Sequence, residues 1–250
     1  MNIPKTVTSH RRRLKTLVVG ASAIVLLGLG ACSHQTATQP EKPSAASTSA
    51  TDSGGSANAT EPWVKIVQHS TQIYGLAKAE NWEKANLRLN QLKQANTRLK
   101  QDSSFAKQDN TSLDAGIQSL EQAVNAKNVQ TSMQAANELV SKTLDLTKQV
   151  KPSPLADVMV LGYQARKLEM AAIAQNADEA NASAKAIQQT WAAKKPELQA
   201  GASSKEAQQV DQVVEQLKAT QSAEDYKQLA PDLIKAEKAL EKSLSSSEKS

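Results

Sequence analysis

The chain has 250 residues, of which 30 are lysine or arginine, 25 are aspartate or glutamate, three are histidine and one is cysteine. A single cysteine excludes an intramolecular disulfide, and three histidines offer little for a zinc or haem site. Phosphate-binding glycine loops, nucleophile elbows, HExxH motifs and Glu-x-x-His pairs are absent from the sequence. No catalytic residue and no metal ligand is therefore predicted, and we expect a protein that is not an enzyme.

The first 31 residues have the pattern of a secretory signal peptide. They contain five basic residues and no acidic one, followed by an apolar run from about Leu17 to Leu29. A membrane-spanning helix needs about 20 apolar residues, so this run is too short to span. A basic start, a short apolar stretch and small residues at a cleavage point predict a signal that is removed from the mature protein.

The end of this segment, Leu29-Gly30-Ala31-Cys32, resembles a bacterial lipobox, the signal of the lipoprotein family. The resemblance covers residues 1–32 only and implies nothing about the folded part. It implies cleavage before Cys32, a diacylglycerol on the cysteine sulfur and an acyl chain on the new amino terminus. A single acyl chain anchors only marginally, so these chains together would hold the protein at a membrane. No other cofactor is expected.

The same resemblance implies a place in the cell envelope, outside the cytoplasm. In a Gram-negative source Ser33 resembles the signal that lets lipoproteins move to the outer membrane. In a Gram-positive source the protein would stay on the outer leaflet of the cytoplasmic membrane. The run from Arg11 to Lys15 partly resembles a twin-arginine export signal, but it lacks the second apolar residue before the lysine, which favours the general secretory route.

Residues 32–60 are predicted to be a disordered tether, because Ser, Thr, Ala, Gly and Pro dominate and almost no aliphatic side chain is present. Its end-to-end distance would be about 30 Å. Without the five basic residues that precede Cys32, the remaining 25 basic and 25 acidic residues balance. A neutral mature protein lacks the positive surface of a nucleic-acid binder, so no nucleic-acid partner is expected.

Residues 61–250 show helical apolar spacing throughout, which predicts an all-α fold. The sequence predicts helix breaks every 46 to 48 residues at Asn81, Asn128, Asn176 and Ser222, each a good N-cap residue. They divide the region into four helical hairpins. The eight predicted helices are 61–79, 82–101, 112–127, 129–150, 154–174, 177–198, 204–220 and 223–246.

Two architectures fit four hairpins. The prolines in the "VKPSP" stretch at 150–154 favour two tandem up-and-down four-helix bundles, at 61–151 and at 152–250, the second ending in a short disordered tail. The alternative is a single α-solenoid, in which each hairpin contacts only its sequence neighbours.

One helix breaks the apolar pattern. In the predicted helix at 154–174, the charged residues Arg166 and Glu169 fall between two apolar stripes, close to Tyr163. We interpret them as a mutually bonded pair that fixes helix register, or else as the lining of a ligand site. The only histidine of the helical region, His69, is predicted to face solvent.

These observations leave two classes of function. The favoured one is a non-enzymatic, lipid-anchored binding or scaffold module that contacts the membrane through its lipid and binds a protein or a small ligand. The alternative is an extracytoplasmic enzyme, or a small-ligand or metal carrier, with its site around Glu169. A cavity lined by Tyr163, Arg166 and Glu169 together would favour the alternative.

Overall fold

The computed structural model describes residues 61–199, 204–220 and 222–247, and within these ranges it contains helices and no strand. The eight helices are α1 (Pro62–Lys78), α2 (Trp82–Gln101), α3 (Thr111–Asn125), α4 (Val129–Val150), α5 (Pro154–Ile173), α6 (Ala177–Gln199), α7 (Ser204–Ala219) and α8 (Ala223–Ser247). The predicted signal peptide, lipobox, tether and C-terminal tail lie outside the described residues. None of the described helices is both long and apolar enough to cross a membrane.

Every predicted helix is present, and its ends lie within two residues of the predicted ones. The predicted N-caps explain this agreement, because the side chains of Asn81, Asn128, Asn176 and Ser222 each accept a hydrogen bond from the backbone N–H three residues on. The α3 start differs slightly: Thr111 is its first helical residue, and Asn110 precedes it without a side-chain cap.

Three of the hairpin turns have the same backbone structure. Glu80, Lys127 and Gln175 adopt positive φ angles of 54°, 51° and 55°, each directly before a capping asparagine. At the first turn, Asn81 N–H donates to the Leu76 carbonyl and Glu80 N–H donates to the Ala77 carbonyl, which is a Schellman motif. The other two turns repeat these bonds. The repeat seen in the sequence is therefore a repeat of one helix-turn-helix connection.

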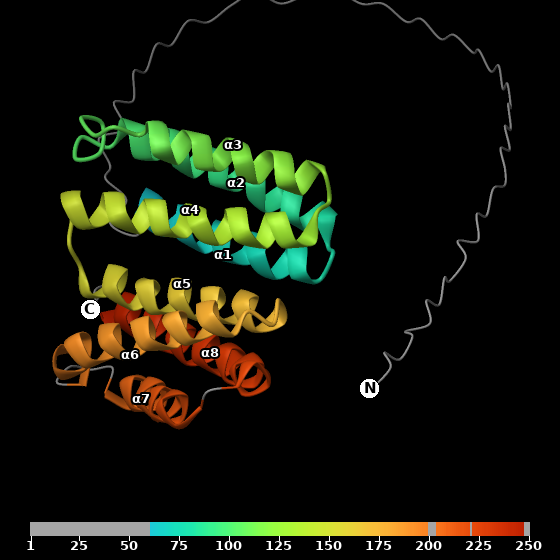
Figure 1. Cartoon of the computed structure of the whole chain (residues 1–250). Coiled ribbons are helices and arrows are strands. Elements are labelled where there is room, and N and C mark those ends of the chain that lie inside the picture. Colours follow the sequence, from blue (N-terminus) through green and yellow to red (C-terminus); the bar gives the residue numbers. More distant parts are fainter. Residues whose placement is uncertain (1–60, 200–203, 221, 248–250) are drawn as a thin grey trace, which may run out of the picture. The chain divides into compact units, whose positions relative to one another are not determined.

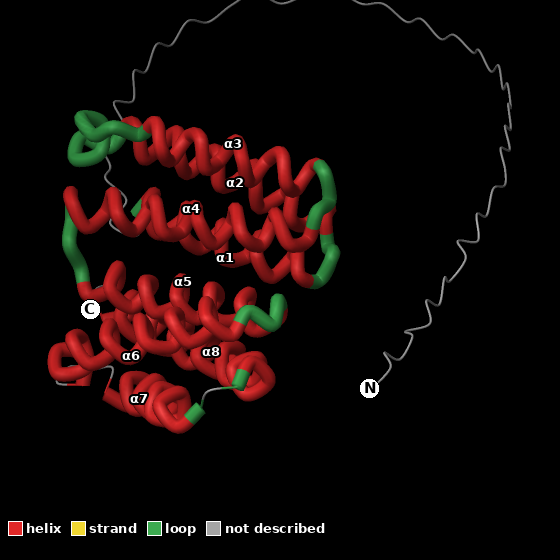
Figure 2. Tube along the Cα trace, viewed as in Figure 1, coloured by secondary structure: helices red, strands yellow, loops and turns green. Residues whose placement is uncertain are grey.

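The helices form two four-helix bundles, as Figures 1 and 2 show. In the first bundle α1 packs against α2 and α4, while α3 packs against α4 and more lightly against α2. In the second bundle α5 packs against α6 and α8, and α7 lies against the same two helices. The contacts of α1 with α4 and of α5 with α8 close each group of four. The all-α, tandem-bundle prediction is confirmed over the solenoid, which has no such closing contacts.

Both bundles have apolar interiors built from residues at helical spacing. Trp63, Ile66, Ile73 and Leu92 are buried in the first core. In the second core Trp191 is buried among the aliphatic residues of α5, α6, α7 and α8, and its indole N–H donates to Asp211 Oδ1 at 2.8 Å. Burial of such side chains is the main favourable contribution to the stability of a helical bundle.

The two cores meet through α5. Leu155, Ala156 and Met159 near its start belong to the first apolar core, whereas Val158 and Leu161 belong to the second. Two bundles that each close their own core would have few contacts across the "VKPSP" stretch, but these residues show that apolar packing does cross it. The division at 151–152 stays a prediction, and a chain cut there would expose part of each core to water.

The positive φ angles at the turns generate a stability prediction. Glu80→Gly, Lys127→Gly and Gln175→Gly should each raise the free energy of unfolding by up to about 1 kcal/mol, because glycine adopts positive φ without steric cost. Urea unfolding followed by circular dichroism measures the change. As a control, Glu83→Gly in the first turn of α2 should lower stability by about 0.5–1 kcal/mol. A loss of stability at all three turn positions would contradict the prediction.

Candidate functional site

The predicted polar cluster lies on α5 where this helix faces the first bundle. Arg166 and Glu169 are only 2% and 3% exposed, although both carry charge. Helical spacing in the sequence places both residues between two apolar stripes of α5, and their burial follows from that position. A charge so far from water is costly unless other groups bond it, so the partners of each residue decide what the cluster does.

The hydrogen-bond donors of the Glu169 carboxylate lie on α1. Tyr74 Oη donates to Glu169 Oε2 at 2.6 Å, and Lys78 Nζ donates to Oε1 at 2.6 Å. Burial, followed by the hydrogen bond to Glu169, raises the pKa of Tyr74 well above its usual range, so the phenol remains a donor. Each carboxylate oxygen of Glu169 therefore has its own donor.

The hydrogen-bond partner of the Arg166 side chain lies on α4 and is not Glu169. Its Nε–H donates to Asn137 Oδ1 at 2.9 Å, while Asn137 Nδ2 donates to the Tyr163 carbonyl at 3.1 Å. The expected mutual pair of Arg166 with Glu169 is absent among the ion pairs of the described residues. That expectation considered α5 alone. The partners come from α1 and α4, whose positions relative to α5 do not follow from the spacing of residues within α5.

A second buried carboxyl, which the sequence analysis missed, lies on α8. Glu237 is 3% exposed, and desolvation raises its pKa from 4.5 to about 8 despite the opposing charge of Arg166. Its carboxyl packs against Gly162 of α5, where an added Cβ would lie 2.6 Å from Glu237 Cδ. The signal was present in the sequence, because Glu237 shares a helix face with Leu233 and Leu240.

The three predicted site residues do not share one cavity. Tyr163 lines a groove of about 570 Å³ formed by α4, α5 and α6. Arg166 lines a separate cavity of about 350 Å³ between α1, α5 and α8. Glu169 is among the lining residues of neither. Tyr163 is thus linked to Arg166 only through Asn137, and the expected common polar site is not formed.

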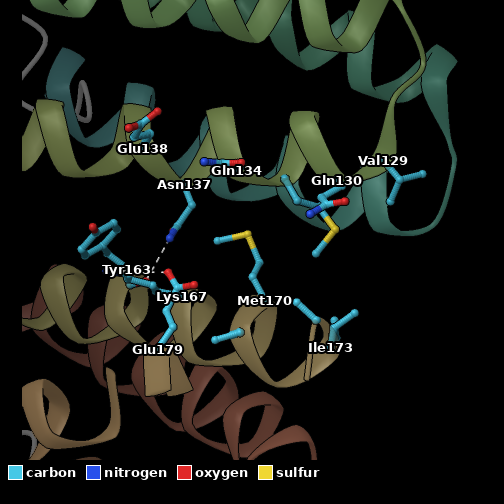
Figure 3. A pocket seen from close by; sticks show the side chains of 13 residues that line it. Val129, Gln130, Gln134, Asn137, Glu138, Tyr163, Lys167, Met170, Ile173 and Glu179 are labelled. Atoms are coloured by element: carbon cyan, nitrogen blue, oxygen red, sulfur yellow. Dashed lines mark hydrogen bonds and ion pairs between the residues drawn. The ribbon is translucent and has the colours of Figure 1, made fainter. Parts of the chain in front are cut away.

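The larger hollow, which we call the α4–α5 groove, has an apolar centre with charged residues around it. Figure 3 shows Met170 and Ile173 of α5 facing Val129 and Gln130 of α4, while the Asn137 side chain points toward Tyr163. Ile173 is 47% exposed and is one of two large apolar side chains that the described residues expose. Lys167 and Glu179 also line the groove, and Lys167 Nζ lies 4.0 Å from Glu179 Oε1.

His69 differs from its prediction. It is half-buried rather than solvent-facing, and burial lowers its pKa, with Arg88 and Lys65 adding to the effect and a hydrogen bond with Gln72 opposing it. Within the described residues no three His, Cys, Asp or Glu side chains come together as a metal site would need.

Comparison of the chain with protein-family models, with curated protein sequences and with solved structures gave no match. The function is therefore argued from the geometry of the groove, the cavity and the polar cluster.

The bonds to Glu169 generate a prediction for a double-mutant cycle. Tyr74→Phe should lower the free energy of unfolding by about 1–3 kcal/mol, because the buried carboxylate of Glu169 loses a donor. Glu169→Leu should also destabilise the protein, because the Tyr74 hydroxyl and the Lys78 ammonium lose their acceptor. The double variant should lose less free energy of unfolding than the two single variants together, and the difference should be about 0.5–3 kcal/mol. Urea unfolding measures all three.

A control cycle pairs Glu169→Leu with Tyr226→Phe, whose hydroxyl bonds Asn181 and the Thr220 carbonyl. These two changes should be additive. Additive effects in the Tyr74 and Glu169 cycle as well would show that the hydrogen bond between them contributes nothing to stability.

Proposed function

We propose that this protein is a lipid-anchored, non-enzymatic binding module of the cell envelope. Cys32 would carry the lipid, and residues 32–60 would tether the helical part to the membrane. The membrane would be contacted through the lipid, and nucleic acid would not be a partner. The lipobox resemblance supports the anchor, and the neutral charge of the mature sequence supports the absence of nucleic acid.

The observation that carries the binding role is the α4–α5 groove. Grooves between helices accept amphipathic helices, whose apolar side chains fill the centre while charged groups meet the rim. Methionine adapts to different apolar shapes, and Met133 and Met170 both line this groove. The partner that fits is an amphipathic helix of another envelope protein, with apolar residues directed at Met170 and Ile173.

The alternative, an enzyme or carrier with its site around Glu169, has less support. Both carboxylate oxygens of Glu169 are already bonded by Tyr74 and Lys78, and the residue lines neither the α4–α5 groove nor the cavity between α1, α5 and α8. A catalytic acid or a metal ligand needs an oxygen that a substrate or ion can reach. The role of Glu169 that fits these contacts is structural.

The anchor is tested at its attachment point. Cys32→Ser should leave an uncut precursor that incorporates no labelled fatty acid, because the thiol is the group that would be modified. Metabolic labelling followed by electrophoresis and membrane fractionation measures both effects. Undiminished labelling of Cys32→Ser would contradict the lipoprotein assignment.

The groove is tested with a matched pair of exposed apolar residues. Ile173→Lys places a charge in the groove, whereas Leu87→Lys, at a residue 55% exposed on α2, places the same charge elsewhere. The tagged variants are purified from their own membranes in mild detergent, and co-purifying proteins are quantified by mass spectrometry. A partner helix should lose at least about tenfold in recovery with Ile173→Lys, the effect of disrupting an interface hot spot.

The Leu87→Lys variant should retain the partner at the level of the unmodified protein. Equal recovery with Ile173→Lys and Leu87→Lys would show that the α4–α5 groove does not bind that partner.

A further inference from the structure

The cavity between α1, α5 and α8 has a charged floor. Its volume is about 350 Å³, within the range of small-molecule sites. Arg166, Glu237, Val67 and Met159 line it and are buried, whereas Gln72 and Lys238 line it and are exposed, so they mark its mouth. Half-buried Gln68, Thr71 and Glu241 complete the lining. We call this hollow the α1–α8 cavity.

The two floor charges keep bonding capacity that the described residues do not use. Arg166 bonds Asn137 through Nε, and its two terminal nitrogens make no hydrogen bond to a described residue. Glu237 is 97% buried, yet it has no hydrogen bond or ion pair with a described residue. Arg166 and Glu237 act on each other only through charge, and their polar atoms are not among the fully enclosed unpartnered ones, so both present free bonding capacity to the cavity that a ligand could use.

Helix packing holds these two groups in place. Gly162 and Arg166 are one turn apart on α5, and the Glu237 carboxyl occupies the space where a Gly162 side chain would begin. The glycine therefore lets α8 bring its carboxyl against α5 beside the guanidinium. Because Arg166 is fixed from the other side by Asn137, the cavity presents a guanidinium and a carboxyl group at defined positions.

This arrangement selects among ligand classes. A ligand with only negative charge would meet Glu237 and Glu241, and one with only positive charge would meet Arg166 and Lys238. A small molecule with one carboxylate and one ammonium group satisfies both floor groups. The guanidinium binds a carboxylate through paired N–H donors, and an ammonium donates to carboxyl oxygens.

We propose that the α1–α8 cavity is a binding site for a small zwitterion of the amino-acid class, whose carboxylate bonds Arg166 and whose ammonium bonds Glu237. Glu241, which accepts a hydrogen bond from Gln68 Nε2 at 3.0 Å, forms the second wall on the ammonium side. Burial raises the pKa of Glu237 to about 8, so the carboxyl holds a proton in the empty cavity at neutral pH and releases it to water when the ammonium of the ligand binds. This site is independent of the α4–α5 groove and of the partner proposed there.

The test is isothermal titration calorimetry with the full lipidated chain in detergent. The probes are the standard amino acids and β-alanine, with propionate and propylamine as single-charge analogues. At least one zwitterion should bind saturably with a Kd below about 1 mM, and both single-charge analogues should bind at least about tenfold more weakly. Glu237→Gln should weaken the zwitterion at least about tenfold, because the charged hydrogen bond to its ammonium is lost.

The matched control is Glu224→Gln, an exposed glutamate in the first turn of the same helix, which should bind like the unmodified chain. Gln72→Trp at the exposed mouth is a second variant that blocks entry without changing the buried floor, and it should abolish binding even if Glu237→Gln unfolds. The proposal is overturned if no probe binds at about 10 mM, if propionate or propylamine binds as tightly as the zwitterion, or if Gln72→Trp leaves binding unchanged.

Discussion

The buried carboxylate of Glu169 is the constraint on which the joining of the two bundles depends. It lies on α5, but both groups that bond it, Tyr74 and Lys78, lie on α1. A buried carboxylate without these donors would be strongly destabilising, so α5 can pack against the first bundle only with α1 in this register. Apolar contacts from Leu155 and Met159 add to the same junction, but apolar packing tolerates small shifts that a buried charge does not.

The sequence was enough to predict the helices because their ends are encoded locally. Asn81, Asn128 and Asn176 cap the next helix with their own side chains, and these bonds span three residues. The burial of Arg166 and Glu169 was also predictable, because it follows from helical periodicity within α5. Their partners were not predictable, since Tyr74 and Asn137 are brought to α5 by the packing of whole helices.

Glu237 illustrates the same limit from the other direction. The stretch around it alternates lysine, alanine and glutamate, which is typical of a solvated helix face. What buries it is the absence of a side chain at Gly162 on another helix. A glycine in a helix weakens that helix slightly, and here the same glycine leaves space for a carboxyl. The helix face that Glu237 shares with Leu233 and Leu240 indicates its burial, but nothing within α8 indicates the space at Gly162 that accommodates it.

The two hollows lie on equivalent seams of the repeat. Gln68 and Gln72 of the α1–α8 cavity stand 95 residues before Tyr163 and Lys167 of the α4–α5 groove, the same spacing that separates Tyr74 from Glu169. One seam has an apolar centre with methionines, and the other has buried charges. The common scaffold therefore offers two surfaces of different chemistry, one on each side of the contact between α1 and α5.

The contact of Tyr74 with Glu169 has a consequence for symmetry. These residues hold matching positions in the two halves, so in a pair of identical bundles packed in this way each would face its own copy. Two glutamates would repel, and two tyrosines would leave one hydroxyl without an acceptor. With both halves on one polypeptide the two positions are free to differ, and a donor can meet an acceptor where a homodimer would place like against like.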